Sequence, residues 1–348
     1  MTFYNNRGAI AHIDEGEVYL FRHVDNQILM DHYIYDKEGR QDKIVEDTLG
    51  EFDIQISEED KIYLIYQDTQ RDLWILLIDK EIKERTRLSE GGMPKVFELN
   101  MFQTSDTMNI VYLTLESSGE GIFNIHHHML KGDKWVSHLV EEIRVDKVLN
   151  PIRILTDGVD ILLFYYQGNQ INLKKFSMEN MEWGSYIPLG DTNRKLYMDV
   201  FKDDVYIHIV YSEYSEENLR IKYMRYLYDG DFLIKEREEI LSNEGNPSNP
   251  TIIKEDNTIW IVWNESSNLY SRYSLDNGDS WSNIYFWKES RTNNIMRYKY
   301  IGTLKGNTIL EHTFGTIYPE IKFLGFGPLN NIEEITPKKK LMESIFKM

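Results

Sequence analysis

Cysteine is absent from the 348 residues, and long hydrophobic runs are absent as well. Without cysteine the chain has no disulfide framework and no thiolate nucleophile. The longest apolar runs, such as 161–166, are far shorter than the roughly 20 residues that a membrane helix needs. The N-terminal sequence MTFYNNRGAIAHIDEGE lacks the basic and apolar regions of a secretory signal. We therefore expect no membrane span and no signal peptide.

Basic residues are also fewer than acidic ones. The chain has 39 Lys and Arg against 57 Asp and Glu, a formal net charge of −18. Such a chain repels phosphate backbones and anionic lipid over long distances, so we expect no nucleic-acid partner. The surplus of Ile, Lys, Asn and Tyr is typical of an AT-rich bacterial genome. We expect a protein that is cytoplasmic, or that is assembled on a bacterial surface by a non-classical route.

Aromatic and β-branched residues are abundant, and they predict an all-β fold. Aromatic residues make up 13% of the chain, including 23 Tyr, which is the composition of pleated surfaces. Apolar strand-like runs recur at steps of 44 to 54 residues, at Val18, Ile62, Ile110, Ile161, Val205, Ile259 and Ile309. Repeats of this length with four short strands each are typical of propeller blades. The sequence predicts a seven-bladed β-propeller of four-stranded antiparallel blades, with six or eight blades as the alternative.

The repeat also predicts the domain organisation. We expect one domain over 1–336, with blades at 1–48, 49–96, 97–146, 147–192, 193–244, 245–292 and 293–336. The last blade, from Arg297 through Ile335, is expected to supply four strands of its own. Residues 337–348 form a basic tail or linker, either frayed or leading to an assembly partner.

The sequence YSLDNGDSWS lies between the third and fourth expected strands of the sixth unit. Its pattern S-x-D-x-G-x-x-W, formed by Ser274, Asp276, Gly278 and Trp281, resembles the Asp-box (BNR repeat) of the sialidase-like propellers. An Asp that accepts backbone N–H bonds, a Gly that permits positive φ and a packed Trp together stabilise a tight hairpin. Reduced versions of the pattern end at Trp135 and Trp183. We interpret the box as a fold element.

The resemblance to sialidases would imply three arginines that hold a carboxylate, an acid/base aspartate, and a tyrosine nucleophile paired with a glutamate. The family also carries an Arg-Ile-Pro stretch in its first inner strand. This chain has Arg7-Gly8-Ala9 there and no Arg-Ile-Pro elsewhere. No catalytic residue is carried over, and the catalytic set stays unknown.

Polar residues recur where the second strand of each unit ends, on the face where ligand loops of propellers usually converge. These candidate ligand-binding residues are Asp68, Glu116, Glu213, Asn264 and Glu265. If their side chains face the channel, they suit a cation, an amine or a sugar. The alternative is a set of solvated loop acids in an acidic chain.

The three consecutive histidines at 126–128 raise the question of a metal site. In a strand only His126 and His128 share a face, and two ligands do not make a site. We expect no metal and no cofactor, with a cation on the acidic face as the open alternative.

Two function hypotheses follow. The first is a binding or scaffold module that recognises a carbohydrate or a protein through its axial loop face. The second is a sialidase-like glycoside hydrolase or lyase that uses carboxylates of that face, since glycosidases work with a pair of carboxylates.

Overall fold

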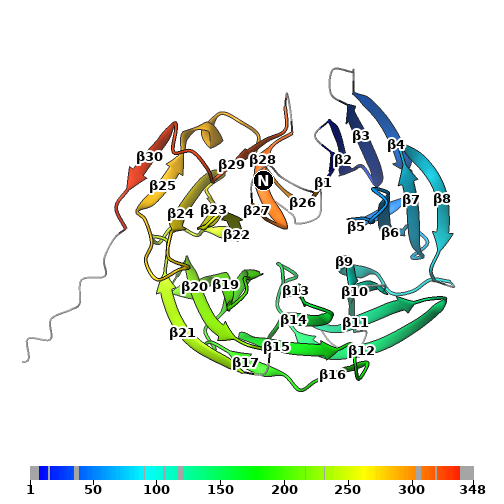
Figure 1. The fold of residues 1–348 in the computed structure, drawn as a ribbon, viewed down its shortest axis with the longest axis horizontal. Helices are drawn as coiled ribbons and strands as arrows, with labels where there is room; N and C mark the ends of the chain where they lie inside the picture. The colour runs from blue at the N-terminus through cyan, green and yellow to red at the C-terminus, as the bar shows by residue number, and fades with distance from the viewer. Residues whose placement is uncertain are drawn as a thin grey trace, which may run out of the picture.

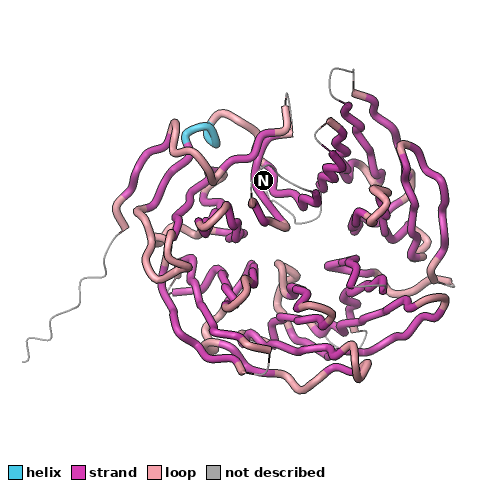
Figure 2. The backbone as a smooth tube through the Cα atoms, in the orientation of Figure 1, coloured by secondary structure: helices cyan, strands magenta, loops and turns pink. Residues whose placement is uncertain are grey.

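The computed structural model describes residues 8–14, 16–34, 39–89, 91–104, 107–116, 121–215, 217–230, 232–302, 307–317 and 320–337. Strands account for most of these residues, and one turn of 3-10 helix, η1 (Lys288–Arg291), is the one helix among them (Figure 2). The expected all-β class is confirmed. Within the described ranges no helix has the length and apolarity to cross a membrane.

The first three units each form a four-stranded antiparallel meander in chain order. The first consists of β1 (Gly8–Asp14), β2 (Glu17–Val24), β3 (Gln27–Ile34) and β4 (Arg40–Val45). The second consists of β5 (Thr48–Ile56), β6 (Ile62–Asp68), β7 (Leu73–Asp79) and β8 (Glu81–Arg87). The third consists of β9 (Val96–Thr104), β10 (Thr107–Leu115), β11 (Ile122–Lys131) and β12 (Lys134–Arg144).

The next three units repeat this order, with an outer strand in two pieces in the fourth. The fourth holds β13 (Ile152–Asp157), β14 (Asp160–Gln167), β15 (Gln170–Ser177), β16 (Glu182–Trp183) and β17 (Ile187–Leu189). The fifth holds β18 (Lys195–Lys202), β19 (Tyr206–Ser215), β20 (Asn218–Tyr228) and β21 (Leu233–Ile240). The sixth holds β22 (Ser248–Glu255), β23 (Thr258–Glu265), β24 (Asn268–Ser274) and β25 (Ile284–Trp287).

The sheets stand around a central axis in the manner of a propeller, with the first strand of each unit innermost and the last strand outermost (Figure 1). Hydrophobic side chains of neighbouring units pack against each other and form the cores. The largest cluster combines residues of the third, fourth and fifth units, such as Ile125, Tyr165 and Tyr211. Full burial of one such side chain stabilises the fold by about 1.5–3 kcal/mol, so each unit depends on its neighbours.

The last part of the chain does not form one blade of four strands, so that prediction is wrong. In the described residues it supplies β26 (Met296–Gly302), β28 (His312–Thr316) and β29 (Lys322–Leu324), and β26 pairs in parallel with β1, so that these three strands share the sheet of the first unit. Two further strands, β27 (Thr308–Ile309) and β30 (Ile332–Ile335), add to the sixth unit instead, beside β22 and β25. Six units of four strands plus these additional strands are therefore what the described chain forms. The tail from 338 onward lies outside the described residues.

Glycine 302 permits the contact between the two ends of the ring. Its φ is +141°, and a Cβ there would lie 2.3 Å from the carbonyl oxygen of His12. Side-chain-bearing residues rarely adopt this φ, and the approach of the two strands leaves no room for a methyl group. The parallel pairing of β1 with β26 therefore depends on this residue.

A left-handed residue recurs near the start of five inner strands. Gly50, Glu98, Asn150, Tyr197 and Asn249 all have positive φ, at +108°, 49°, 50°, 57° and 50°. At four of the five positions the register of the inner strand shifts, which marks a β-bulge. The bulge redirects the following side chains toward the next unit.

Charged side chains after these bulges bond to the neighbouring inner strand. Asp53 accepts a hydrogen bond from the backbone N–H of Met101 at 2.7 Å, and its carboxylate also contacts Lys299 Nζ at 2.7 Å. Asp199 accepts from the backbone N–H of Ile252 at 2.9 Å and lies 3.1 Å from Arg153 Nε. These buried charges connect successive units around the axis.

Candidate functional site

The hairpin of the Asp-box pattern connects β24 and β25, as the sequence predicts, and its polar atoms bond to one another. The Ser274 hydroxyl donates to Asp276 Oδ1 at 2.8 Å and accepts from the Gly278 N–H at 2.7 Å. The Asp276 carboxylate accepts from the Ser280 N–H at 2.8 Å and from the Ser280 hydroxyl at 2.6 Å. Because these bonds favour the ionised form, they lower the pKa of Asp276 to about 2.

The same hairpin packs against the fifth unit. The Trp281 ring meets the Tyr223 ring edge to face at 4.9 Å, and Gly278 has a φ of +86° directly over the Tyr223 hydroxyl. Arg225 donates to the Asn277 carbonyl at 2.6 Å and pairs with Asp279 at 2.9 Å. The hairpin thus joins two units, and its interpretation as an Asp-box stays a prediction.

Two of the five candidate ligand-binding residues have their carboxylates bonded within the fold. Asp68 accepts from the Asp72 N–H at 2.8 Å and from Trp74 Nε1 at 2.7 Å. Glu213 contacts Lys222 Nζ through both oxygens, at 3.1 and 3.2 Å, and is 8% exposed. Both carboxylates stabilise their own unit.

The other three candidates lie in the third and sixth units. Glu116 accepts from the Asn124 side chain at 2.8 Å. Asn264 is buried and lies 3.4 Å from the Ser248 hydroxyl. Glu265 lies against Gly245, and burial raises the pKa of its carboxyl. The five residues belong to four separate units, and their role in ligand binding stays a prediction.

The histidines of β11 bond to protein partners. His126 Nε2 lies 2.8 Å from the Thr114 hydroxyl, and His128 Nε2 lies 2.8 Å from the Tyr112 hydroxyl. His127 points to the other face and is completely buried, and its burial lowers its pKa to about 3. Over the described ranges, no group of three or more His, Cys, Asp or Glu side chains is arranged to hold a metal ion.

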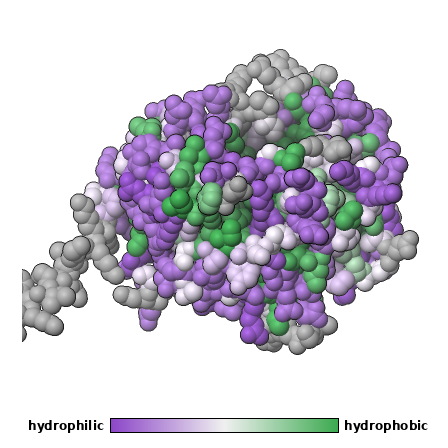
Figure 3. All heavy atoms as spheres, turned by 60° about the horizontal axis from the view of Figure 1, so that its bottom comes forward, coloured by the Kyte–Doolittle hydropathy of each residue, from purple (hydrophilic) through white to green (hydrophobic). Residues whose placement is uncertain are grey.

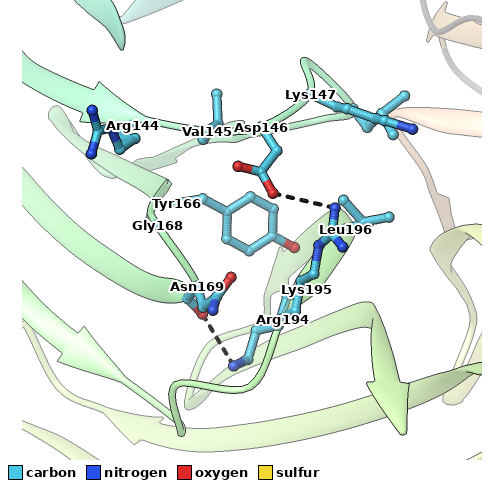
Figure 4. Close-up of a pocket in the computed structure, with 11 residues that line it drawn as sticks. Arg144, Val145, Asp146, Lys147, Tyr166, Gly168, Asn169, Arg194, Lys195 and Leu196 are labelled. Carbon is cyan, nitrogen blue, oxygen red and sulfur yellow. Dashed lines mark hydrogen bonds and ion pairs between the residues drawn. The ribbon is translucent and has the colours of Figure 1, made fainter. Parts of the chain in front are cut away.

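A cavity of about 310 Å³ opens between the fourth and fifth units (Figure 4). Its lining comes from the connection between the third and fourth units, from the turn between β14 and β15, and from the start of β18. The lining residues are Arg144, Val145, Asp146, Lys147, Leu149, Tyr166, Gly168, Asn169, Arg194, Lys195 and Leu196. Its volume is at the lower end of the range for small-molecule sites, about 300–1,000 Å³.

A two-residue turn fixes one wall of this cavity. Gly168, with a φ of +59°, and Asn169 connect β14 to β15, as in a tight hairpin with Gly at the first turn position. The Gly168 N–H donates to the Arg144 carbonyl at 2.8 Å, and the Gln167 side chain accepts from the Arg144 N–H at 2.8 Å. The turn therefore holds the end of β12 in place.

Lysine 195 fixes the opposite wall. Its side chain is completely buried, and its ammonium group donates to three backbone carbonyls, those of Asn169, Asp191 and Asn193, at 3.2, 2.7 and 2.7 Å. It also pairs with the Asp191 carboxylate at 2.6 Å. Burial alone would raise the pKa of Asp191, but the hydrogen bonds from Lys195 and Lys222 outweigh it and lower that pKa. This lysine joins the fourth unit to the loop that carries Arg194.

The mouth of the cavity carries exposed polar side chains above an apolar floor. The Arg194 guanidinium lies 3.2 Å from the Asp146 carboxylate, and their side chains are 44% and 73% exposed. Figure 4 shows the Tyr166 ring between Asp146 and Asn169, with the guanidinium of Arg194 reaching toward Asp146. Tyr166 is 4% exposed, and its hydroxyl has no hydrogen-bond partner among the described residues. Burial raises the pKa of this hydroxyl well above its usual value.

This cavity lies at the second-strand exit of the fourth unit, Tyr166-Gln167-Gly168, which has no acidic residue. The pattern of recurring acids therefore does not mark this exit. A usable signal was the group of basic residues in the two connections beside this exit, Arg144 and Lys147 on one side and Arg194 and Lys195 on the other.

A larger groove of about 700 Å³ lies between the fifth and sixth units. Its basic side chains are bonded internally: Arg220 pairs with Glu244, and Arg272 donates to the carbonyls of Ser282, Leu241 and Trp281. Its rim ends at Pro337, where the described residues end.

No protein-family model and no curated protein sequence matches the chain. Among solved structures, a chain of the Kuenenia stuttgartiensis hydrazine synthase is similar at 9% identity and a TM-score of 0.51, over 78% of this chain and 77% of that one. At this identity the likeness shows a shared fold alone.

Two carbohydrate-related structures are more distant in shape. One is a variant of the Aleuria aurantia lectin in complex with alpha-methyl-L-fucoside, at 14% identity and a TM-score of 0.47, over 82% of this chain and 96% of that one. The other is a family-43 endo-arabinanase from Bacillus licheniformis, at 15% identity and a TM-score of 0.37, over 67% and 92%. These scores are too low to support a functional argument. The relationship to sialidase-like propellers stays a prediction without support from these comparisons.

Proposed function

We propose that this propeller is a carbohydrate-binding module and that the cavity between the fourth and fifth units is its binding site. The observation that carries the proposal is the exposed Asp146–Arg194 pair above the Tyr166 ring. Sugar hydroxyls are bound by planar charged side chains that offer two hydrogen bonds each, such as a carboxylate and a guanidinium. In this proposal β26, β28 and β29 count as a seventh, three-stranded blade.

The site is rigid before a ligand arrives. The clamps at Gly168 and Lys195 fix both walls, so little conformational entropy is lost on binding. The Asp146–Arg194 pair contributes little to stability because both side chains are largely exposed. The Arg194 guanidinium also lies 4.8 Å from the centre of the Tyr214 ring, which holds it at the mouth where a ligand can reach it.

A glycan array tests the proposal, with Asp146→Asn and Arg194→Gln as site variants. We expect the wild-type protein to bind a defined set of glycans and each variant to lose at least about tenfold in affinity, since one hydrogen bond to a charged group contributes about 1.5–3 kcal/mol. Glu333→Gln is the control, because Glu333 is an exposed acid of the sixth unit, away from the cavity lining. If no glycan binds, the proposal is wrong and a protein partner becomes the better hypothesis.

A screen of chromogenic glycosides addresses the enzyme alternative. Glu265, whose pKa burial raises, is the acid on this face that resembles a general acid. Turnover that disappears in Glu265→Gln would replace the binding proposal with a hydrolase, whereas binding without turnover supports a binding module.

A further inference from the structure

The charges at the cavity mouth differ in sign from those of the whole molecule. The chain carries a formal charge of −18, yet four of the eleven lining residues are basic and one, Asp146, is acidic. Two of the basic residues are neutralised: Arg194 by Asp146, and Lys195 by Asp191. Arg144 and Lys147 remain.

These two remaining cations have no carboxylate partner among the described residues. Both side chains are exposed, and they lie on opposite sides of the mouth in Figure 4. Hydrogen bonds to the Arg144 N–H and carbonyl fix the backbone of this residue. Its guanidinium therefore stays near the mouth of the cavity. Two cations beside one cavity that no carboxylate neutralises favour an anionic group at this point.

We propose that the ligand of this cavity is an anionic saccharide, that is, a sugar chain with carboxylate or sulfate groups that reach Arg144 and Lys147. This inference rests on the proposed carbohydrate function and adds the charge class of the ligand. Arg144 suits a two-pronged contact with a planar or tetrahedral oxyanion, and Lys147 supplies a point charge. The sugar rings occupy the cavity, and the acidic groups extend to the rim.

The experiment compares acidic and neutral saccharides on one array. It includes uronate-containing oligosaccharides, their methyl esters, sulfated oligosaccharides and neutral oligosaccharides of the same linkages. We expect the uronates or the sulfated chains to bind and the esters, which keep the ring and lose the charge, to bind at least about fivefold more weakly. The uronate and sulfate arms identify which anion is recognised.

The double variant Arg144→Gln/Lys147→Gln provides the site-specific readout. By calorimetric titration with the best acidic ligand, we expect it to lose about tenfold in affinity and most of the salt dependence that wild type shows between about 50 and 500 mM NaCl. Lys134→Gln is the matched control because Lys134 is an exposed cation at the other end of the same strand, β12. It should bind as wild type does.

The outcomes separate the two proposals. Binding of neutral saccharides that is equal to or tighter than binding of acidic ones overturns the anionic inference and leaves the carbohydrate proposal standing. An acidic ligand whose affinity and salt dependence survive in the double variant also overturns it, since the charge would then be recognised elsewhere. No binding of any saccharide overturns both.

Discussion

The Ser274–Trp281 hairpin and the mouth of the cavity are both polar turns on the propeller, but their polar atoms bond differently. In the hairpin, Ser274, Asp276 and Ser280 bond to each other. At the mouth, Arg144 and Lys147 have no carboxylate partner in the described part, and Arg194 forms an exposed ion pair with Asp146. The difference is the reason why we propose the mouth of the cavity as the binding site and interpret the hairpin as a fold element.

Gly278→Ala should cause the largest loss of stability, because Gly278 lies where the hairpin packs against the fifth unit. A Cβ there would lie 2.1 Å from the Tyr223 hydroxyl, at a φ that alanine also disfavours. We expect a loss of about 3 kcal/mol in the free energy of unfolding, measured by urea denaturation. Gly132→Ala is the control, since Gly132 has a similar positive φ with open space around it, and it should lose about 1 kcal/mol. Equal losses would show that the packing is unimportant.

Glu98→Gln should change how the free energy of unfolding depends on pH, because Glu98 is a buried acid on an inner strand. Burial and the nearby Glu51 raise the pKa of Glu98 to about 7, above its unfolded value of about 4.3. The stability that comes from protonated Glu98 is therefore present below pH of about 4 and is lost as pH rises through about 7. Urea titrations at several pH values should show a variant about 2 kcal/mol more stable than wild type at pH 8 and no gain at pH 4.

The exposed Glu333→Gln serves as the control for this pH series. It should leave the pH profile of the free energy of unfolding unchanged. A Glu98→Gln variant that tracks wild type at every pH would mean that Glu98 is not buried as described.

Arg194→Lys tests the mouth of the cavity, where binding and not stability should change. The variant keeps the positive charge and loses the planar fork that faces Asp146. We expect a three- to tenfold loss of glycan affinity, roughly 1 kcal/mol, with a free energy of unfolding within about 0.5 kcal/mol of wild type. A large loss of stability would assign Arg194 to the fold instead of the site.

Asp276→Ala should have a small, purely structural effect. The exposed carboxylate accepts three side-chain or backbone hydrogen bonds within the hairpin, so we expect a loss of about 1 kcal/mol at pH 7. Because the pKa of Asp276 is lowered to about 2, this stabilisation is present above pH of about 4 and decreases as pH falls toward 2. The difference between variant and wild type should therefore shrink in acid.

Local signals account for what the sequence could predict. Alternating strands at a regular spacing predicted the all-β fold and the meander of each unit, and eight consecutive residues predicted the hairpin at Asp276. The cavity combines three segments, 144–149, 166–169 and 194–196, that no local pattern connects. β30 pairs with β25 because the outer edge of the sixth unit is open in the assembled fold. The sequence of so short a strand does not indicate which sheet edge it will join.

The central claim is that the cavity binds the ligand and the hairpin stabilises the fold. The most direct test is a calorimetric titration of one array-selected saccharide into Arg194→Gln and Asp276→Ala, side by side with wild type. We predict at least about tenfold weaker binding for Arg194→Gln and wild-type affinity for Asp276→Ala. Wild-type affinity in Arg194→Gln, together with loss of binding in folded Asp276→Ala, would contradict the claim and move the site to the hairpin.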